Sequence, residues 1–326
     1  MLLLNADEVR QALPMKECVQ AMKSAYAALS AGKAEVPLRL RLPVAPNQGL
    51  SLFMPAFVDD PAGQALAVKI VSLFDHNPSR GLPFIHAAVL VLHSQTGAVE
   101  ALLEGGSLTA IRTGAGCGAA TDVLARADAR TVAIFGAGVQ ARTQLAAVCA
   151  VRPIETAWVY APAGVEAFIA EMAGHGDVPA DLRAAASPAE ALAGADIVSA
   201  ATTSAAPVFA HADLRPGTHV NGAGSYTLEM QEIPAETVAA GLAAVDSRSA
   251  ALVESGDLQR PLAAGLLQEA EIAEIGEIIA GTRPGRRDAE QITFFKSVGV
   301  AVQDALAAQL ALQNARKLGL GTEVAW

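Results

Sequence analysis

The segment TVAIFGAGVQA at residues 131–141 constrains the fold of this chain more than any other. A β-branched apolar run ends in a turn of the form Gly136-x-Gly138-x-x-Ala141, and a helix-like stretch follows at once. In such a turn the first glycine permits a sharp bend, and the second lets the backbone approach a pyrophosphate at the positive end of the helix. We therefore predict a dinucleotide site, and the alternative is a tight strand-to-helix turn that binds nothing.

The composition is that of a globular chain. Its 326 residues, 52% of them hydrophobic and 17% charged, suffice for one large domain or two ordinary ones. The net charge of −10 argues against nucleic acid and anionic membranes as partners, and no run reaches the roughly 18 apolar residues of a membrane span. Cys18, Cys117 and Cys149 are too few and too scattered for a disulfide framework or a zinc site. We therefore expect no metal, buried free thiols and a cytoplasmic location.

The first part of the chain, up to about residue 120, opens with helical patterns and continues with strand-like runs. Asn5-x-x-Glu8 is a capping-box pattern that marks a helix start. The runs that follow are LRLRLPV (38–44), LSLFMPAFV (50–58), ALAVKIVSLF (65–74) and HAAVLVLHSQTG (86–97). The first of these alternates cleanly, which predicts one face on a core and the other in polar surroundings. Because no helix separates these runs, we expect an antiparallel or mixed sheet.

The part from about 120 to 300 instead alternates strand and helix patterns. Strands are expected at 131–137, 156–161, 182–186, 196–202, 218–223 and 242–247, and helices at 139–151, 164–174 and 188–194. This rhythm predicts a parallel sheet covered on both faces, which places the chain in the α/β class with a doubly wound sheet. A long amphipathic segment, 297–319, ends at Gly319 as a helix should.

Three cations in the first part of the chain are candidates for binding an acid. Lys69 lies in an otherwise apolar strand, where an ammonium is unfavourable unless it meets an anion. The alternative is that Lys69 faces solvent. Arg112 lies in LTAIRTGAG, which looks like a helix start. Arg39 shares a strand face with Arg41, and one or both could equally be surface cations.

Further candidates for cofactor contact follow the fourth and fifth strands of the predicted parallel sheet. Ligands bind at the carboxyl edge of such a sheet, and the alternative is ordinary capping of loops by hydroxyl groups. The candidate cofactor residues are Gly136, Ala137, Gly138, Val139, Gln140, Ala141, Thr202, Thr203, Ser204, Asn221, Gly222 and Ala223. For Asp304, a helix-surface or interface role and a site role are equally open. His76, His86 and His93 lack ligand spacing, so structural roles are favoured.

Taken in order along nearly the whole chain, the motifs resemble those of the ornithine cyclodeaminase/mu-crystallin family. The marks are Pro37-x-Arg39, a Met54-Pro55-Ala56 turn, Lys69 in VKIVS, Arg112 in LTAIRTGA, GAGVQA, ATTSAAPV (201–208), PGTHVNGAGSYT (216–227), GDLQRPL (256–262) and TFFKSVGVAVQDA (293–305). The resemblance implies a Rossmann dinucleotide-binding domain, 121–304, inserted into a mixed α+β dimerisation and substrate-binding domain, 1–120 plus 305–326. It also implies a homodimer.

The resemblance further implies a site. Arg39, Lys69 and Arg112 would hold a substrate carboxylate beside the nicotinamide of NAD(P)H, with Lys69 and Arg112 also serving catalysis. Planar guanidinium groups suit this task because they orient a carboxylate as well as attract it. Cyclodeaminases of the family carry an acid where this chain has Tyr226, and a glutamate where it reads Ser51-Leu52-Phe53.

Without those carboxylates the pattern favours hydride transfer to a C=N carbon next to a carboxylate, which needs fewer protein groups than deaminative cyclisation. The resemblance therefore implies a reductase of a small cyclic imino acid, of the Δ1-pyrroline-2-carboxylate type, that gives a proline-type amino acid. The alternatives are an ornithine cyclodeaminase, an alanine-dehydrogenase-like enzyme and a non-catalytic NADPH-binding protein of the mu-crystallin kind.

The choice between NADH and NADPH depends on the end of the second strand of the parallel sheet. NAD enzymes usually place an acid there to bind the ribose 2′-hydroxyl. This chain reads Tyr160-Ala161-Pro162, with neither an acid nor a base, so NADPH is allowed and slightly favoured. Arg142 could assist a 2′-phosphate, and the alternative is a solvated helix cation.

Overall fold

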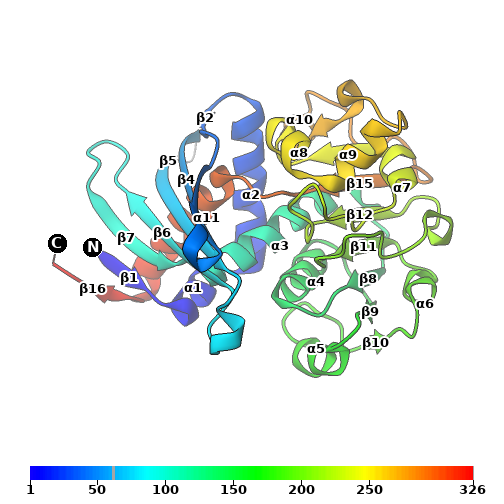
Figure 1. Ribbon diagram of the computed structural model, residues 1–326, viewed down its shortest axis with the longest axis horizontal. Coiled ribbons are helices and arrows are strands. Elements are labelled where there is room, and N and C mark those ends of the chain that lie inside the picture. Colours follow the sequence, from blue (N-terminus) through cyan, green and yellow to red (C-terminus); the bar gives the residue numbers. More distant parts are fainter. Residues whose placement is uncertain (61–62, 326) are drawn as a thin grey trace. The chain divides into compact units, whose positions relative to one another are not determined.

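The computed structural model describes residues 1–60 and 63–325, which form two compact units (Figure 1). The first unit consists of residues 1–112 and 300–326, and the second of residues 113–299. The chain passes from one unit to the other after residues 112 and 299, a few residues before the predicted boundaries at 120 and 304. The first falls inside helix α3 (Gly105–Leu124), and the second immediately precedes helix α11 (Ala301–Leu318). Asp304, placed by the sequence in the nucleotide domain, thereby belongs to the first unit.

The first unit is built on one mixed sheet. Its strands are β1 (Leu2–Leu4), β2 (Ala34–Glu35), β3 (Leu40–Val44), β4 (Gly49–Asp60), β5 (Gly63–Phe74), β6 (Ile85–Leu92), β7 (Val99–Glu104) and β16 (Thr322–Glu323). The order is β16-β1-β7-β6-β5-β4-β2, with β3 also on β4. Among the described strands of this sheet, only β1 and β7 pair in parallel, which confirms the mixed sheet. Figure 1 shows β1 and β16, from the two ends of the chain, together at one edge.

One face of this sheet is covered by helices. The predicted capping box forms at α1 (Ala6–Ala12), where the Asn5 side chain accepts from the N–H groups of Asp7 and Glu8. Helices α2 (Met15–Ser30) and α11 pack on the sheet. Along β5 every second side chain from Ala65 to Val71 is buried, and Lys69 belongs to this inward series. The alternation of the strand therefore excludes the solvent-facing orientation of Lys69.

Two local predictions in the first unit are wrong. Met54-Pro55-Ala56 is no turn but the middle of β4, where the pairing with β3 ends at Phe53 and the pairing with β2 begins at Phe57. Proline is tolerated in a strand where no ladder bond is needed from its nitrogen. The leucine face of LRLRLPV does not lie on the core of this chain, because Leu38, Leu40 and Leu42 are 80%, 64% and 52% exposed.

The second unit is a wholly parallel sheet, as predicted. Its strands are β8 (Thr131–Phe135), β9 (Thr156–Tyr160), β10 (Leu182–Ala184), β11 (Ile197–Ala200), β12 (His219–Gly222), β13 (Leu242–Val245), β14 (Ala273–Glu274) and β15 (Thr293–Lys296). The order is β10-β9-β8-β11-β12-β15-β13-β14, and every pair is parallel. The predicted doubly wound α/β class is thus correct.

Both faces of the parallel sheet are buried. In β8, Val132 and Ile134 belong to one apolar core, whereas Ala133 and Phe135 belong to the other. The helices are α4 (Val139–Val151), α5 (Val165–Met172), α6 (Pro188–Leu192), α7 (Ala235–Ala239), α8 (Arg248–Glu254), α9 (Gly256–Ala263) and α10 (Ile275–Ile279). Within the described ranges of the chain, no helix is both long enough and apolar enough to cross a bilayer.

Candidate functional site

A cleft of about 800 Å³ opens at the carboxyl ends of β8 and β11 in the second unit. These neighbouring strands continue the chain in opposite directions across the sheet, to β9 on one side and to β12 on the other. Open α/β sheets bind their ligands at such a switch point. The cleft is lined mainly by Phe135–Gly138, Tyr160–Ala163, Ala201–Ser204 and Pro207–Val208.

The glycine turn at the cleft has the shape that a pyrophosphate needs. Gly136 has φ +109°, and a Cβ on it would lie 2.7 Å from the carbonyl oxygen of Ala201, so the tight bend requires glycine. A Cβ on Gly138 would meet nothing within 4 Å, which leaves open space next to the backbone. Gly138 is the N-cap of α4 and no side chain caps this helix, so its first N–H groups suit a phosphate. Ala141 is buried and packs the helix on the sheet.

The other predicted cofactor residues divide into three groups. Ala137, Thr202, Thr203 and Ser204 line the cleft, and Val139 and Gln140 lie in the first turn of α4. Asn221, Gly222 and Ala223 are not among the described residues that line it.

The side chain of Asn221 is committed to the core of the second unit. Its amide donates to Thr121 and Ser199, and its Oδ1 lies 3.1 Å from Nε2 of His219. A cofactor contact at residues 221–223 therefore stays a prediction.

The cleft itself carries no charged side chain among its described lining residues. Arg142, the cation closest in sequence to the glycine turn, is engaged elsewhere. Its Nε donates to Glu171 at 2.8 Å, its Nη1 donates to the carbonyls of Ala137 and Gly138, and its guanidinium lies over the ring of Phe168. Arg142 thus holds the turn through the carbonyl groups of Ala137 and Gly138.

A buried cluster of charge lies in the first unit, and we name Lys69, Arg112, Gln303 and Asp304 the basic cluster. The Nζ of Lys69 lies 3.0 Å from Oδ1 and 2.8 Å from Oδ2 of Asp304, and the Nε of Arg112 donates to Oδ1 at 2.9 Å. All four residues are at least 95% buried. Asp304 is therefore a residue of the candidate site, which sequence reasoning had left open.

Gln303 completes the cluster by holding Arg112 in place. Its Oε1 accepts from Nη1 of Arg112 at 3.0 Å and from the N–H of Val300 at 2.9 Å, while its Nε2 donates to the hydroxyl of Tyr26. Sequence reasoning missed Gln303. The available signal was a pair of polar residues in the first turn of a helix whose other inward positions are mostly alanine and leucine.

The basic cluster has an excess of positive charge. Burial lowers the pKa of Lys69 from 10.5 to about 8, and the charge of Arg112 acts in the same direction. Asp304 opposes this shift, and Arg39 adds to it, so Arg39 lies close enough for its charge to act on Lys69. Two buried cations, Lys69 and Arg112, thus share the carboxylate of Asp304, which is an environment that favours a second, bound carboxylate.

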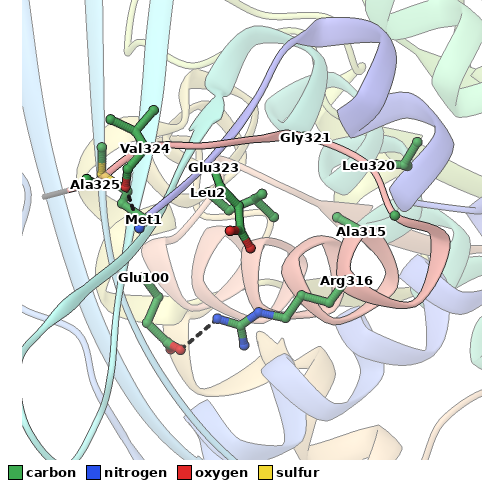
Figure 2. A pocket seen from close by; sticks show the side chains of 11 residues that line it. Met1, Leu2, Glu100, Ala315, Arg316, Leu320, Gly321, Glu323, Val324 and Ala325 are labelled. Atoms are coloured by element: carbon green, nitrogen blue, oxygen red, sulfur yellow. Dashed lines mark hydrogen bonds and ion pairs between the residues drawn. The ribbon is translucent and has the colours of Figure 1, made fainter.

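The first unit has a hollow of about 640 Å³ beside the two ends of the chain (Figure 2). Figure 2 shows Arg316 reaching Glu100 and the amino group of Met1 bonded to the carbonyl of Val324. None of the basic-cluster residues lines it, and we do not include it in the site. In the part of the chain that the structure describes, no three His, Cys, Asp or Glu side chains gather in a way that could hold a metal ion.

Comparison with known proteins places these two sites in context. A model of the ornithine cyclodeaminase/mu-crystallin family matches residues 1–318. The chain is 39% identical to a Δ1-pyrroline-2-carboxylate reductase of Bacillus cereus, over 99% of both sequences.

Two solved structures extend the likeness to the fold. The Thermococcus litoralis Δ1-pyrroline-2-carboxylate reductase in complex with NADH and L-proline is 42% identical with a TM-score of 0.92, over 99% of this chain and 100% of that one. An archaeal alanine dehydrogenase dimer with bound NAD is 28% identical with a TM-score of 0.90, over 100% of this chain and 99% of that one.

Proposed function

This chain belongs to the ornithine cyclodeaminase/mu-crystallin family, and on that premise we propose that it is an NAD(P)H-dependent reductase of a small cyclic imino acid such as Δ1-pyrroline-2-carboxylate. The observation that carries the proposal is the basic cluster, in which buried Lys69 and Arg112 share the single carboxylate of Asp304. The similarity to reductases named for this substrate supports the same assignment.

The basic cluster would hold the substrate through its carboxylate. Among the described residues, Arg112 uses Nε and Nη1 for Asp304 and Gln303, which leaves Nη2 for a ligand. Within the described part of the chain, the ammonium of Lys69 bonds to Asp304 alone and keeps further N–H groups to donate. Arg39 adds a third positive charge. Charge-assisted bonds of this kind both attract and orient a planar carboxylate.

Lys69 is also the proposed source of the proton. Reduction of the imine adds a hydride at carbon and a proton at nitrogen, and the nicotinamide supplies the hydride when it is bound. A lysine whose pKa is about 8 is protonated at neutral pH and yields its proton more readily than an ordinary lysine. We assign Lys69 Nζ the proton transfer, directly or through one water molecule.

The cleft is the proposed cofactor site. The bend at Gly136, the open space at Gly138 and the uncapped start of α4 support a dinucleotide there. The described lining of the cleft holds no acid that would repel a ribose 2′-phosphate, so we propose that both coenzymes bind and that NADPH is slightly favoured. Values of kcat/KM measured with NADPH and with NADH test the preference.

We also propose a homodimer formed through the outward face of the first unit's sheet. Leu40 pairs with Phe53, which pairs with Ile70, so these side chains share the face opposite α11. Leu40 and Ile70 are 64% and 39% exposed, and apolar surface of this kind marks an interface. Light scattering should give the mass of two chains, and Leu40→Asp, but not Leu266→Asp in the second unit, should give the mass of one.

The buried thiols support a cytoplasmic location. Cys18, Cys117 and Cys149 are unpaired, and burial raises the pKa of each to about 12, which keeps them inert. Fluorescence of the tagged protein in its host cell tests the location.

One panel tests the activity. NADPH and NADH oxidation is followed with Δ1-pyrroline-2-carboxylate, Δ1-piperideine-2-carboxylate and pyruvate plus ammonia, beside an assay for ammonia release from ornithine. We expect turnover of a cyclic imine. Ammonia release with catalytic NAD⁺ would instead establish a cyclodeaminase, and coenzyme binding without any turnover would establish a binding protein.

A further inference from the structure

A second buried charged cluster lies in the second unit, behind the wall of the cleft. We name Ser225, Glu232, Asp257 and Lys296 the backing cluster, and all four are 0% exposed. Ser225 and Glu232 come from the chain after β12, Asp257 from α9 and Lys296 from the end of β15. Charged side chains are rarely buried so completely unless each is paired and hydrogen-bonded.

Asp257 and Lys296 form the base of this cluster. The Nζ of Lys296 donates to Oδ2 of Asp257 at 2.8 Å and to the carbonyl of Ser225 at 2.7 Å, and the hydroxyl of Ser225 donates to the same Oδ2. Oδ1 of Asp257 accepts from the N–H groups of Glu232 and Ile233. Both oxygens are therefore occupied, and the backbone of Glu232 is fixed.

The carboxylate of Glu232 in turn joins two loops, because it accepts hydrogen bonds from backbone N–H groups of both. Its Oε1 accepts from the N–H of Thr202 at 2.5 Å, and its Oε2 accepts from those of Gly224 and Ser225 at 2.7 and 2.6 Å. The loops also touch directly, since a Cβ on Gly224 would lie 2.1 Å from the carbonyl oxygen of Thr202. Thr202 belongs to the segment that lines the cleft, so the buried carboxylate of Glu232 holds this segment from the side of the protein interior.

We propose that Glu232 is a positioning residue for the dinucleotide: it fixes the wall Ala201–Ser204 in the shape that receives the cofactor. Ser225 and Lys296 resemble a serine–lysine nucleophile pair, but their complete burial excludes contact with a substrate. Burial raises the pKa of Glu232, while Lys296 opposes and Asp257 adds to that shift. Accepting three N–H groups is a task for the ionised form. The inference rests on the proposed cofactor site and not on the identity of the substrate.

Strand β11, which Thr202 follows, offers a matched control at its amino end. Asp196 immediately precedes β11 and accepts from the N–H groups of Arg130 and Thr131 at 2.8 and 3.1 Å, and from Arg126 at 2.7 Å. It performs the same kind of backbone bonding at the amino edge of the sheet, where no residue of the cleft lies. If Glu232 only supported folding, neither substitution would change the Kd of the cofactor in the folded protein, whereas a positioning role predicts a higher Kd for the Glu232 variant alone.

The experiment compares Glu232→Gln with Asp196→Asn in the full chain. The dissociation constant of NADPH is measured by fluorescence titration, and folding is measured by thermal unfolding. Both variants should unfold at lower temperature than the unmodified protein. Glu232→Gln should raise Kd about tenfold or more, because an amide cannot accept all three N–H groups, whereas Asp196→Asn should leave Kd within about twofold.

Equal Kd values for folded Glu232→Gln and the unmodified protein would overturn the proposal, and so would an equal rise in Asp196→Asn. If Glu232→Gln does not fold, Ser225→Ala serves instead, because it removes only one hydroxyl from the backing cluster. It should raise Kd about threefold, and an unchanged Kd contradicts the proposal. Cofactor binding without turnover of any imine would refute the proposed reaction while leaving this comparison intact.

Discussion

The cleft of the second unit and the basic cluster of the first differ in what they are made of. The cleft is formed largely by backbone and small side chains, without a charge among its described lining residues. The basic cluster is formed by three charged side chains and one amide, and its members Lys69 and Asp304 stand 235 residues apart. The glycine turn of the cleft is one contiguous sequence motif. The basic cluster forms only when distant segments of the chain fold together. Variants in the two sites should therefore fail in different ways.

The largest difference is expected from Lys69→Ala. It removes one of the cations that would hold the substrate and the proposed proton donor, while Arg112 still pairs with Asp304. We expect kcat/KM for the imine to fall about 10³-fold, because general acid catalysis and a charge-assisted bond are lost together. The dissociation constant of NADPH should stay within about twofold. A variant with unimpaired kcat/KM would remove Lys69 from the mechanism.

Asp304→Asn should affect both folding and the pH dependence of activity. Without its anion, the basic cluster keeps Lys69 and Arg112 buried and uncompensated, which should lower the free energy of unfolding by about 3–5 kcal/mol. Asp304 also raises the pKa of Lys69. Because the proton donor must be protonated, activity should decline with rising pH at a lower pH than in the unmodified protein. A decline at the same or a higher pH would contradict this role for Asp304.

The depressed pKa of Lys69 predicts a further effect on stability. Between pH 8 and 10.5 the unfolded chain retains a proton that the folded protein has released, so this group makes folding more favourable as pH rises. The stability of the unmodified protein relative to Lys69→Met should rise by up to about 3 kcal/mol across that window. Urea unfolding at a series of pH values measures it. A difference that stays constant would mean that Lys69 titrates normally, and one that shrinks would mean that folding raises its pKa; either result contradicts the prediction.

The smallest effect is expected at the glycine turn, where two glycines should behave differently. Gly138→Val introduces a side chain into open space, so unfolding should be little changed while the Kd of NADPH rises about tenfold or more. Gly136→Ala should instead destabilise the fold, because of its φ of +109° and the nearby carbonyl of Ala201. Thermal unfolding and coenzyme titration separate the two. Unchanged coenzyme binding in Gly138→Val would place the pyrophosphate elsewhere.

The parts predicted from sequence are those set by local pattern. The six strands expected in the second unit are all present, and α4 begins and ends at the predicted residues, Val139 and Val151. Strand β15 was missed, because Thr293 and Lys296 interrupt its apolar pattern with side chains that the fold buries.

The features that could not be predicted depend on contacts that no local sequence pattern indicates. The exposure of Leu40 depends on its place on the sheet face opposite α11, which an alternating sequence does not specify. The partnership of Asp304 with Arg112, across 192 residues, likewise has no local signal. Buried polar pairs between distant segments are thus where sequence reasoning fell short.

The most direct test is a comparison of Δ1-pyrroline-2-carboxylate with Δ1-pyrroline, the same ring without its carboxylate, as substrates for NADPH oxidation. If the basic cluster binds the substrate carboxylate, kcat/KM should be higher for Δ1-pyrroline-2-carboxylate than for Δ1-pyrroline by about 10³-fold or more. The reason is that two charge-assisted contacts are made to the carboxylate. Equal turnover of the two rings, or no turnover of the carboxylate, would contradict the account.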